Sequence, residues 1–155
     1  MLEWLQNSAF SQWVVGSDSL LAYPTVLTLH TVGLGVVVGV ATVLNLRLLG
    51  VGAGIPLQEM RSLFRLFWAG FLINLISGLV LFASAAVEKA GQPVFYVKLS
   101  CIAIAVAVTV RIRRRAFSAD DRRLDAPAGT RALAGLSLAL WTGAIVAGRL
   151  MAYLK

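Results

Sequence analysis

The sequence predicts an all-α protein, a four-helix transmembrane bundle with an N-terminal interfacial amphipathic helix. Of the 155 residues, 59% are hydrophobic and only 14% are charged, whereas soluble domains usually carry about 25% charged residues. The apolar residues form four long runs, each able to cross a hydrocarbon core of about 30 Å as a helix. The arginines gather mainly between the runs. One membrane domain, residues 1–155, is the natural count at this length.

The N-terminal residues are too few and too polar to span a bilayer. Residues 2–14 nevertheless place apolar side chains at helical spacing. We expect an amphipathic helix at 2–14 that lies in the membrane interface, with Trp4 and Trp13 at the level of the lipid headgroups.

Four transmembrane helices should follow. The first carries Pro24 near its start, where a missing N–H costs least. The third has a middle that alternates small and branched residues, which would also suit a strand, but its place between a polar turn and a basic cluster favours a spanning helix. The expected boundaries are 20–49, 63–87, 94–112 and 132–154.

The arginines predict how the chain is oriented. They concentrate in the loops 50–62 and 111–131 and at the adjoining helix ends, and the positive-inside rule places such loops in the cytoplasm. Four spans then put both termini outside, and Arg47 should extend to the cytoplasmic rim. A basic cluster can also indicate nucleic acid, but the flanking apolar runs favour a lipid bilayer as the partner and no nucleic acid.

The candidate site centres on His30, the only histidine of the chain, which lies inside the first apolar run. Neutral imidazole is a usual ligand of haem iron, and a haem needs small residues against its face. Gly33 lies one turn from His30, and Asn74 lies at a similar depth in the second span. Lys98 and Arg149, near the outer ends of their spans, could meet the propionates. This predicts haem b, bound by His30, Gly33, Asn74, Lys98 and Arg149, with His30 as the iron ligand.

The second axial ligand of such a haem stays open, and so do two other interpretations of His30. A membrane haem normally takes two axial ligands, and the second would be Met151, which we expect to be too shallow, or a histidine of another subunit. The ring could instead bond across helices to Asn74, Ser77 or a backbone carbonyl, or it could handle protons or substrate. Trp141 is expected at the same depth as His30 and Asn74.

The function classes that remain are few. The sequence has no Ser–His–Asp arrangement with a credible acid in the membrane and no phosphate-binding glycine loop, so it favours a non-enzymatic role. One class is a haem-binding electron-transfer or redox-accessory subunit with a membrane redox partner. Another is a scaffold or partner-binding protein that forms homo-oligomers through Gly35 and Gly39, a G-x-x-x-G pair. The third is a small transporter or channel, which the lack of an acid within a span weakens.

Particular segments resemble a family of small bacterial four-helix membrane proteins of unassigned function. The resemblance rests on L-H-T-V-G-L-G at His30, L-N-L-R-L-L-G at Arg47, S-G-L-V-L-F-A at Gly78 and F-Y-V-K at Lys98. It implies the bacterial inner membrane. Many members have Asp where this chain has Asn45. More distantly, the layout resembles copper-resistance D-type and cytochrome-b-like membrane proteins, which implies haem by analogy of fold.

Overall fold

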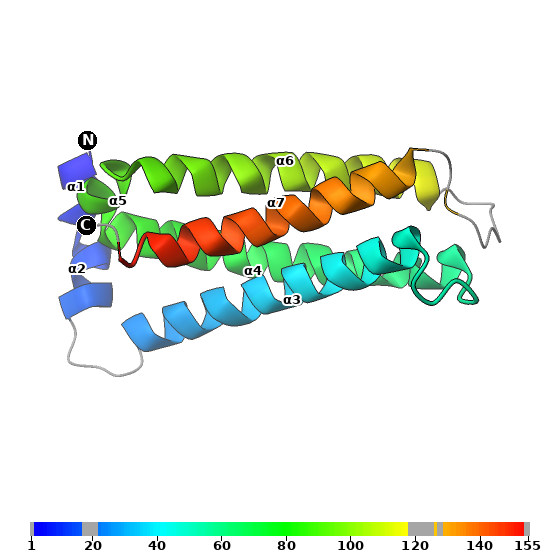
Figure 1. The fold of residues 1–155 in the computed structure, drawn as a ribbon. Coiled ribbons are helices and arrows are strands. Elements are labelled where there is room, and N and C mark those ends of the chain that lie inside the picture. The colour runs from blue at the N-terminus through cyan, green and yellow to red at the C-terminus, as the bar shows by residue number, and fades with distance from the viewer. Residues whose placement is uncertain (1, 17–21, 118–125, 127–128, 154–155) are drawn as a thin grey trace.

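The structure, a computed structural model, describes residues 2–16, 22–117, 126 and 129–153. Every regular element in these residues is helical. Four helices are long and apolar enough to cross a membrane, which confirms the predicted number of long apolar helices. They run lengthwise beside one another (Figure 1) and are α3 Tyr23–Leu49, α4 Leu63–Ser84, α6 Pro93–Ala116 and α7 Thr130–Leu150.

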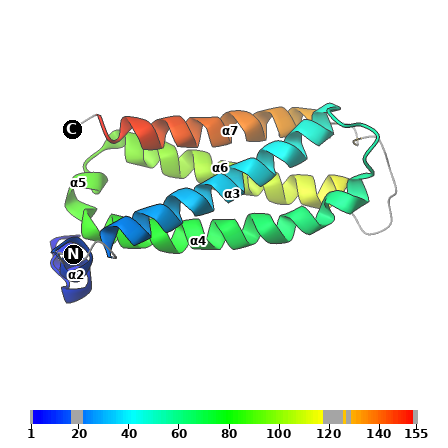
Figure 2. The same ribbon diagram turned by 90° about the horizontal axis from the view of Figure 1, so that it is seen from below.

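The four long helices are arranged as two pairs. Helix α3 packs along α4, α6 packs along α7, and the pairs meet between α3 and α7. Figures 1 and 2 show that the two ends of the bundle are built differently. We call the end with the α3–α4 connection and the C-terminus of α6 the arginine end. The terminal end carries α1 Leu2–Gln6, α2 Ala9–Gly16, α5 Ala86–Ala90 and the C-terminus of α7.

The hydrophobic core lies in the half of the bundle nearer the arginine end. Phe67 is fully buried, and its ring meets Trp141 edge-on with centroids 6.0 Å apart. Phe64 and Phe117 pack edge to face at 5.0 Å. Large apolar side chains such as Leu79 stay exposed on the outside of the helices, as a helix that faces lipid requires.

The N-terminal segment differs from the prediction of one helix over 2–14. It forms two short helices, α1 and α2, that break at Asn7 and Ser8. The Ser8 hydroxyl accepts a hydrogen bond from the Ser11 N–H at 3.3 Å, which satisfies a free donor at the start of α2. Trp4 is 76% exposed, which suits an interfacial position, although that position stays a prediction.

The ends of α3 and α4 also differ from the expected boundaries. Helix α3 begins at Tyr23 rather than at 20, and residues 20 and 21 lie outside the described part. Helix α4 ends at Ser84 rather than at 87 because Ala85 leaves helical geometry, with φ −139° and ψ 36°. The Ala85 N–H bonds to the Phe82 carbonyl at 3.1 Å, a tightened last turn, and α5 follows.

At the arginine end, two expectations are corrected. Helix α6 continues past 112 to Ala116, so Arg111 to Arg115 belong to its last turns and not to a loop. Arginine is a good helix former, and its charge suits a helix C-terminus. Helix α7 begins at Thr130 and ends at Leu150, earlier at both ends than predicted.

Arg47 is buried under the connection between α3 and α4, and its expected place at the cytoplasmic rim stays a prediction. It is only 4% exposed, and it donates from Nε to the Ile55 carbonyl at 2.8 Å and from Nη2 to the Ala53 carbonyl at 3.0 Å. Gly50 ends α3 with φ 110°, a left-handed conformation that glycine adopts without strain. The turn thus folds back over Arg47, and the predicted loop 50–62 contains the 3₁₀ helix η1 Leu57–Ser62.

Candidate functional site

A cavity of about 540 Å³ opens in the half of the bundle nearer the terminal end. All four long helices contribute to its wall, together with α1 and α5. It forms where α3 and α7, which lie close together at the arginine end, separate from each other (Figure 2). The lining includes His30, Gly78, Phe95, Lys98, Gly148 and Met151.

The His30 ring is fixed by hydrogen bonds to α4. Its Nδ1 lies 3.0 Å from the backbone carbonyl oxygen of Asn74 and 3.2 Å from Oγ of Ser77. Because a carbonyl can only accept, the shorter contact assigns the proton to Nδ1 in the neutral ring and the lone pair to Nε2, and Asn74 Nδ2, 3.4 Å from Nδ1, then does not donate to it. Asn74 returns a bond from its side-chain Nδ2 to the His30 carbonyl at 2.8 Å. These contacts confirm the expectation of a histidine bonded across helices, and none of the hydrogen bonds among the described residues uses Nε2.

Glycines allow the close approach of α3 and α4 around this ring. A Cβ at Gly33 would lie 2.8 Å from the Asn74 backbone nitrogen, and a Cβ at Gly78 would lie 3.0 Å from His30 Cε1. Gly33 therefore packs under the neighbouring helix and does not face the cavity. Gly78 is the glycine that gives the imidazole its space.

The predicted site residues are only partly brought together. Of these, His30 and Lys98 line the cavity, whereas Asn74 lies behind the ring that it orients. Arg149 is exposed, with its Cζ 5.6 Å from the centre of the Tyr153 ring.

The depths estimated from the sequence are also changed. Trp141 packs on Phe67 in the core and not beside His30. Because α3 begins at Tyr23, His30 falls within the first third of that helix and closer to the terminal end than expected. Met151, which the sequence analysis placed too near the surface to be a ligand, lines the same cavity as His30.

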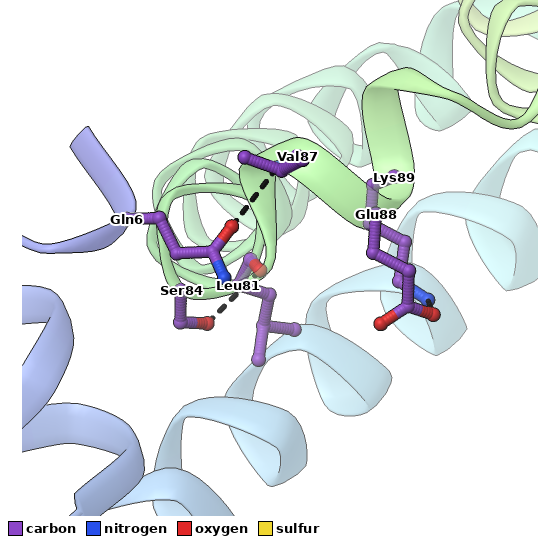
Figure 3. Close-up of polar contacts among 6 residues, drawn as sticks. All are labelled: Gln6, Leu81, Ser84, Val87, Glu88 and Lys89. Atoms are coloured by element: carbon purple, nitrogen blue, oxygen red, sulfur yellow. Dashed lines mark hydrogen bonds and ion pairs between the residues drawn. The ribbon is translucent and has the colours of Figure 1, made fainter. Parts of the chain in front are cut away.

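Several residues at the mouth of the cavity were not singled out as site residues from the sequence. Figure 3 shows Gln6 of α1, whose Oε1 accepts the Val87 N–H at 3.0 Å and so joins α1 to α5. Glu88 and Lys89 form an ion pair at 3.0 Å in the same region. Lys89 lies on α5, which starts after α4 breaks at Ala85, and the sequence contains no helix-breaking residue at that point.

Two stacked aromatic rings contribute to the cavity wall. Phe82 and Phe95 lie nearly parallel, with ring centroids 5.2 Å apart. The signal for both was already in the segments that carry the family resemblance. The cavity therefore combines an apolar wall, an imidazole, a thioether, the ammonium group of Lys98 and the ion pair of Glu88 and Lys89. Within the described residues, no group of three or more His, Cys, Asp or Glu gathers as a metal site.

Comparison with protein-family models, curated proteins and solved structures found no match to this chain.

Proposed function

We propose that this protein binds haem b in the cavity at the terminal end, as an electron-transfer or redox-accessory subunit. Its four apolar helices suggest an integral, multi-pass membrane protein. The observation that carries the haem proposal is the hydrogen bond of the His30 ring to α4. A hydrogen bond from Nδ1 to a backbone carbonyl is the arrangement that orients an imidazole for ligation through Nε2.

The residues present fit such a group. His30 would supply the axial nitrogen, with Asn74 and Ser77 holding the ring. The thioether of Met151, on the same cavity, is the candidate for a second ligand within this chain. Lys98 lines the cavity and would bind a propionate, whereas Lys89 lines it in an ion pair with Glu88 and Arg149 is less well placed. The haem, when bound, would supply one-electron transfer, and the apolar part of the wall would pack against its ring.

The test uses the full chain expressed with added haem precursor and purified in mild detergent. We expect a Soret band and a pyridine haemochrome that are lost in His30→Ala. Thr31→Ala is the matched control, because Thr31 is exposed on the same turn and bonds only to the Leu27 carbonyl among the described residues. Absence of haem from the parent protein, or equal haem content in His30→Ala, would reject the proposal.

We also propose an orientation, with the arginine end in the cytoplasm and both termini outside the bacterial inner membrane. The arginines near the ends of α4 and α6 lie at one end of the bundle, and α1 and the C-terminus of α7 lie together at the other (Figure 1). Reporter fusions at the C-terminus test this. An alkaline phosphatase fusion should be active and a fluorescent-protein fusion dark, and the reverse pattern would invert the orientation.

Self-association is a second candidate, favoured by one specific observation. A Cβ at Gly35 or at Gly39 would meet nothing within 4 Å, so the G-x-x-x-G pair is not used for packing inside the bundle. A helix of a second copy could approach there. Gly35→Leu should then reduce cross-linked oligomers, whereas Gly135→Leu, at another open glycine, should not. Equal oligomer content in the parent and both variants would rule out this interface. No feature of the described residues favours a transporter or channel.

A further inference from the structure

A second pocket, of about 390 Å³, lies at the arginine end, remote from His30. It forms between the η1–α4 junction and the last turns of α6. Its floor contains the buried rings of Phe64 and Phe117, which pack edge to face at 5.0 Å. Its rim carries the guanidinium groups of Arg61, Arg65 and Arg113, and the polar side chains of Gln58 and Ser62 complete the lining.

The three arginines converge without an acidic partner in the described part of the chain. Arg61 comes from η1, Arg65 from the first turns of α4 and Arg113 from the end of α6. The Arg113 Cζ lies 5.8 Å from the centre of the Phe64 ring, a cation–π contact that holds this group over the pocket. Three like charges around one concave site repel one another, and a bound anion would relieve this repulsion. Arginine forks match the geometry of phosphate oxygens.

The surroundings of the pocket indicate which phosphate would bind. Arg65 heads a row of outward-facing residues on α4 that continues at helical spacing through apolar side chains. The row includes Leu72, Ile73 and Ile76, which are all exposed. Helix α4, which carries them, is long and apolar enough to span a membrane. An amphiphile would therefore find cationic donors for its headgroup directly above an apolar track for its chains. Basic pockets between spanning helices are known sites for anionic lipid headgroups.

We propose that Arg61, Arg65 and Arg113 bind the phosphate headgroup of an anionic phospholipid, whose acyl chains lie along the outer face of α4. This site is independent of the haem proposal, because the two pockets share no residue.

The experiment titrates the full chain, purified in mild detergent, with phosphatidylglycerol and with phosphatidylcholine, and counts bound lipid by native mass spectrometry. A third arm uses soluble glycerol 1-phosphate. The site variant is the triple Arg61→Gln, Arg65→Gln and Arg113→Gln. The matched control is Arg111→Gln, Arg114→Gln and Arg131→Gln, which removes the same charge from exposed positions outside this pocket, two of them at a separate basic pocket on α6.

We expect the parent and the control triple to prefer phosphatidylglycerol and the site triple to bind it at least about tenfold more weakly. Equal losses in both triples would mean diffuse attraction to basic charge, and no loss in either would mean no site here; both overturn the proposal. Glycerol 1-phosphate that displaces the lipid at equal concentration would identify a free-phosphate site and also overturn it. Circular dichroism checks the fold. If the triple does not fold, Arg65→Gln and Arg113→Gln singly should each weaken binding relative to Arg131→Gln, and unchanged binding would reject the proposal.

Discussion

The two halves of the bundle use the same four helices in opposite ways. In the half near the arginine end, large side chains such as Phe67 and Trp141 fill the space between the helix pairs. In the half near the terminal end, α7 separates from α3, and Gly78 and Gly148 border a cavity. Large interlocking side chains fill the space between the helices in the first half, whereas the divergence of α3 from α7 leaves space open in the second. A packed half can therefore hold the helices together while the other half keeps room for a ligand.

Polar side chains follow the same division. In the packed half, Asn45 donates from Nδ2 to Oγ of Ser137 at 2.9 Å, and both residues are buried. In the open half, the His30 ring bonds to α4 through Nδ1. The first pair joins two helices and is buried on every side, whereas the ring is half-buried and borders the cavity. The comparison separates a polar contact that stabilises from one that also leaves a group for chemistry.

The largest expected effect is a loss of stability in the packed half. Phe67→Ala removes a fully buried ring that contacts Trp141, Trp68 and Phe71. It should lower the free energy of unfolding by about 3–5 kcal/mol, because the lost contacts leave a void that rigid helices cannot fill. Unfolding in mixed micelles with increasing denaturing detergent, followed by circular dichroism, measures this.

Phe82→Ala is the matched control for that variant, since Phe82 borders the cavity and is only half-buried. Its loss should be clearly smaller. If both variants unfold with equal ease, the two halves do not differ in packing as described.

An intermediate effect is expected where α3 and α4 meet beside His30. Gly33→Ala places a Cβ 2.8 Å from the Asn74 backbone nitrogen and 3.0 Å from the Gly70 carbonyl oxygen, so the helices must move apart. Overpacking of this kind should cost about 1–3 kcal/mol. Gly35→Ala, in the same helix but with nothing within 4 Å, should cost nothing measurable or stabilise α3 slightly. Similar stability of the two variants by the same unfolding assay would contradict the close approach.

The number of spans could be predicted from the sequence because hydrocarbon thickness sets the length of an apolar run. The residues at which these helices end could not be predicted. The chain through Ser84, Ala85 and Ala86 has no proline or glycine, yet α4 stops there. At Arg111 to Arg115 the charge suggested a loop, but arginine extends a helix as well as it solvates a turn.

The candidate site shows the same limit. His30 could be identified because it is the one imidazole in an apolar run, and Asn74 and Ser77 were among the partners expected for it. The cavity could not be foreseen, since it depends on the separation of α3 from α7 (Figure 2), and neither helix signals that separation in its own sequence. The depth estimate failed for Trp141, which packs on Phe67, because a shift of a few residues in a helix end moves a side chain by about 1.5 Å per residue.

The smallest predicted effect measures the polar contact of the packed half. Asn45→Ala and Ser137→Ala each remove one partner of a buried bond between α3 and α7. Bonds of this kind in membrane proteins are worth about 0.6 kcal/mol on average in double-mutant cycles, because the separated helices find other partners. The double variant should therefore cost less than the sum of the single variants by roughly that amount. A coupling energy of zero would mean that side-chain packing alone holds α3 and α7 together, and the cavity would then depend only on where the large side chains end.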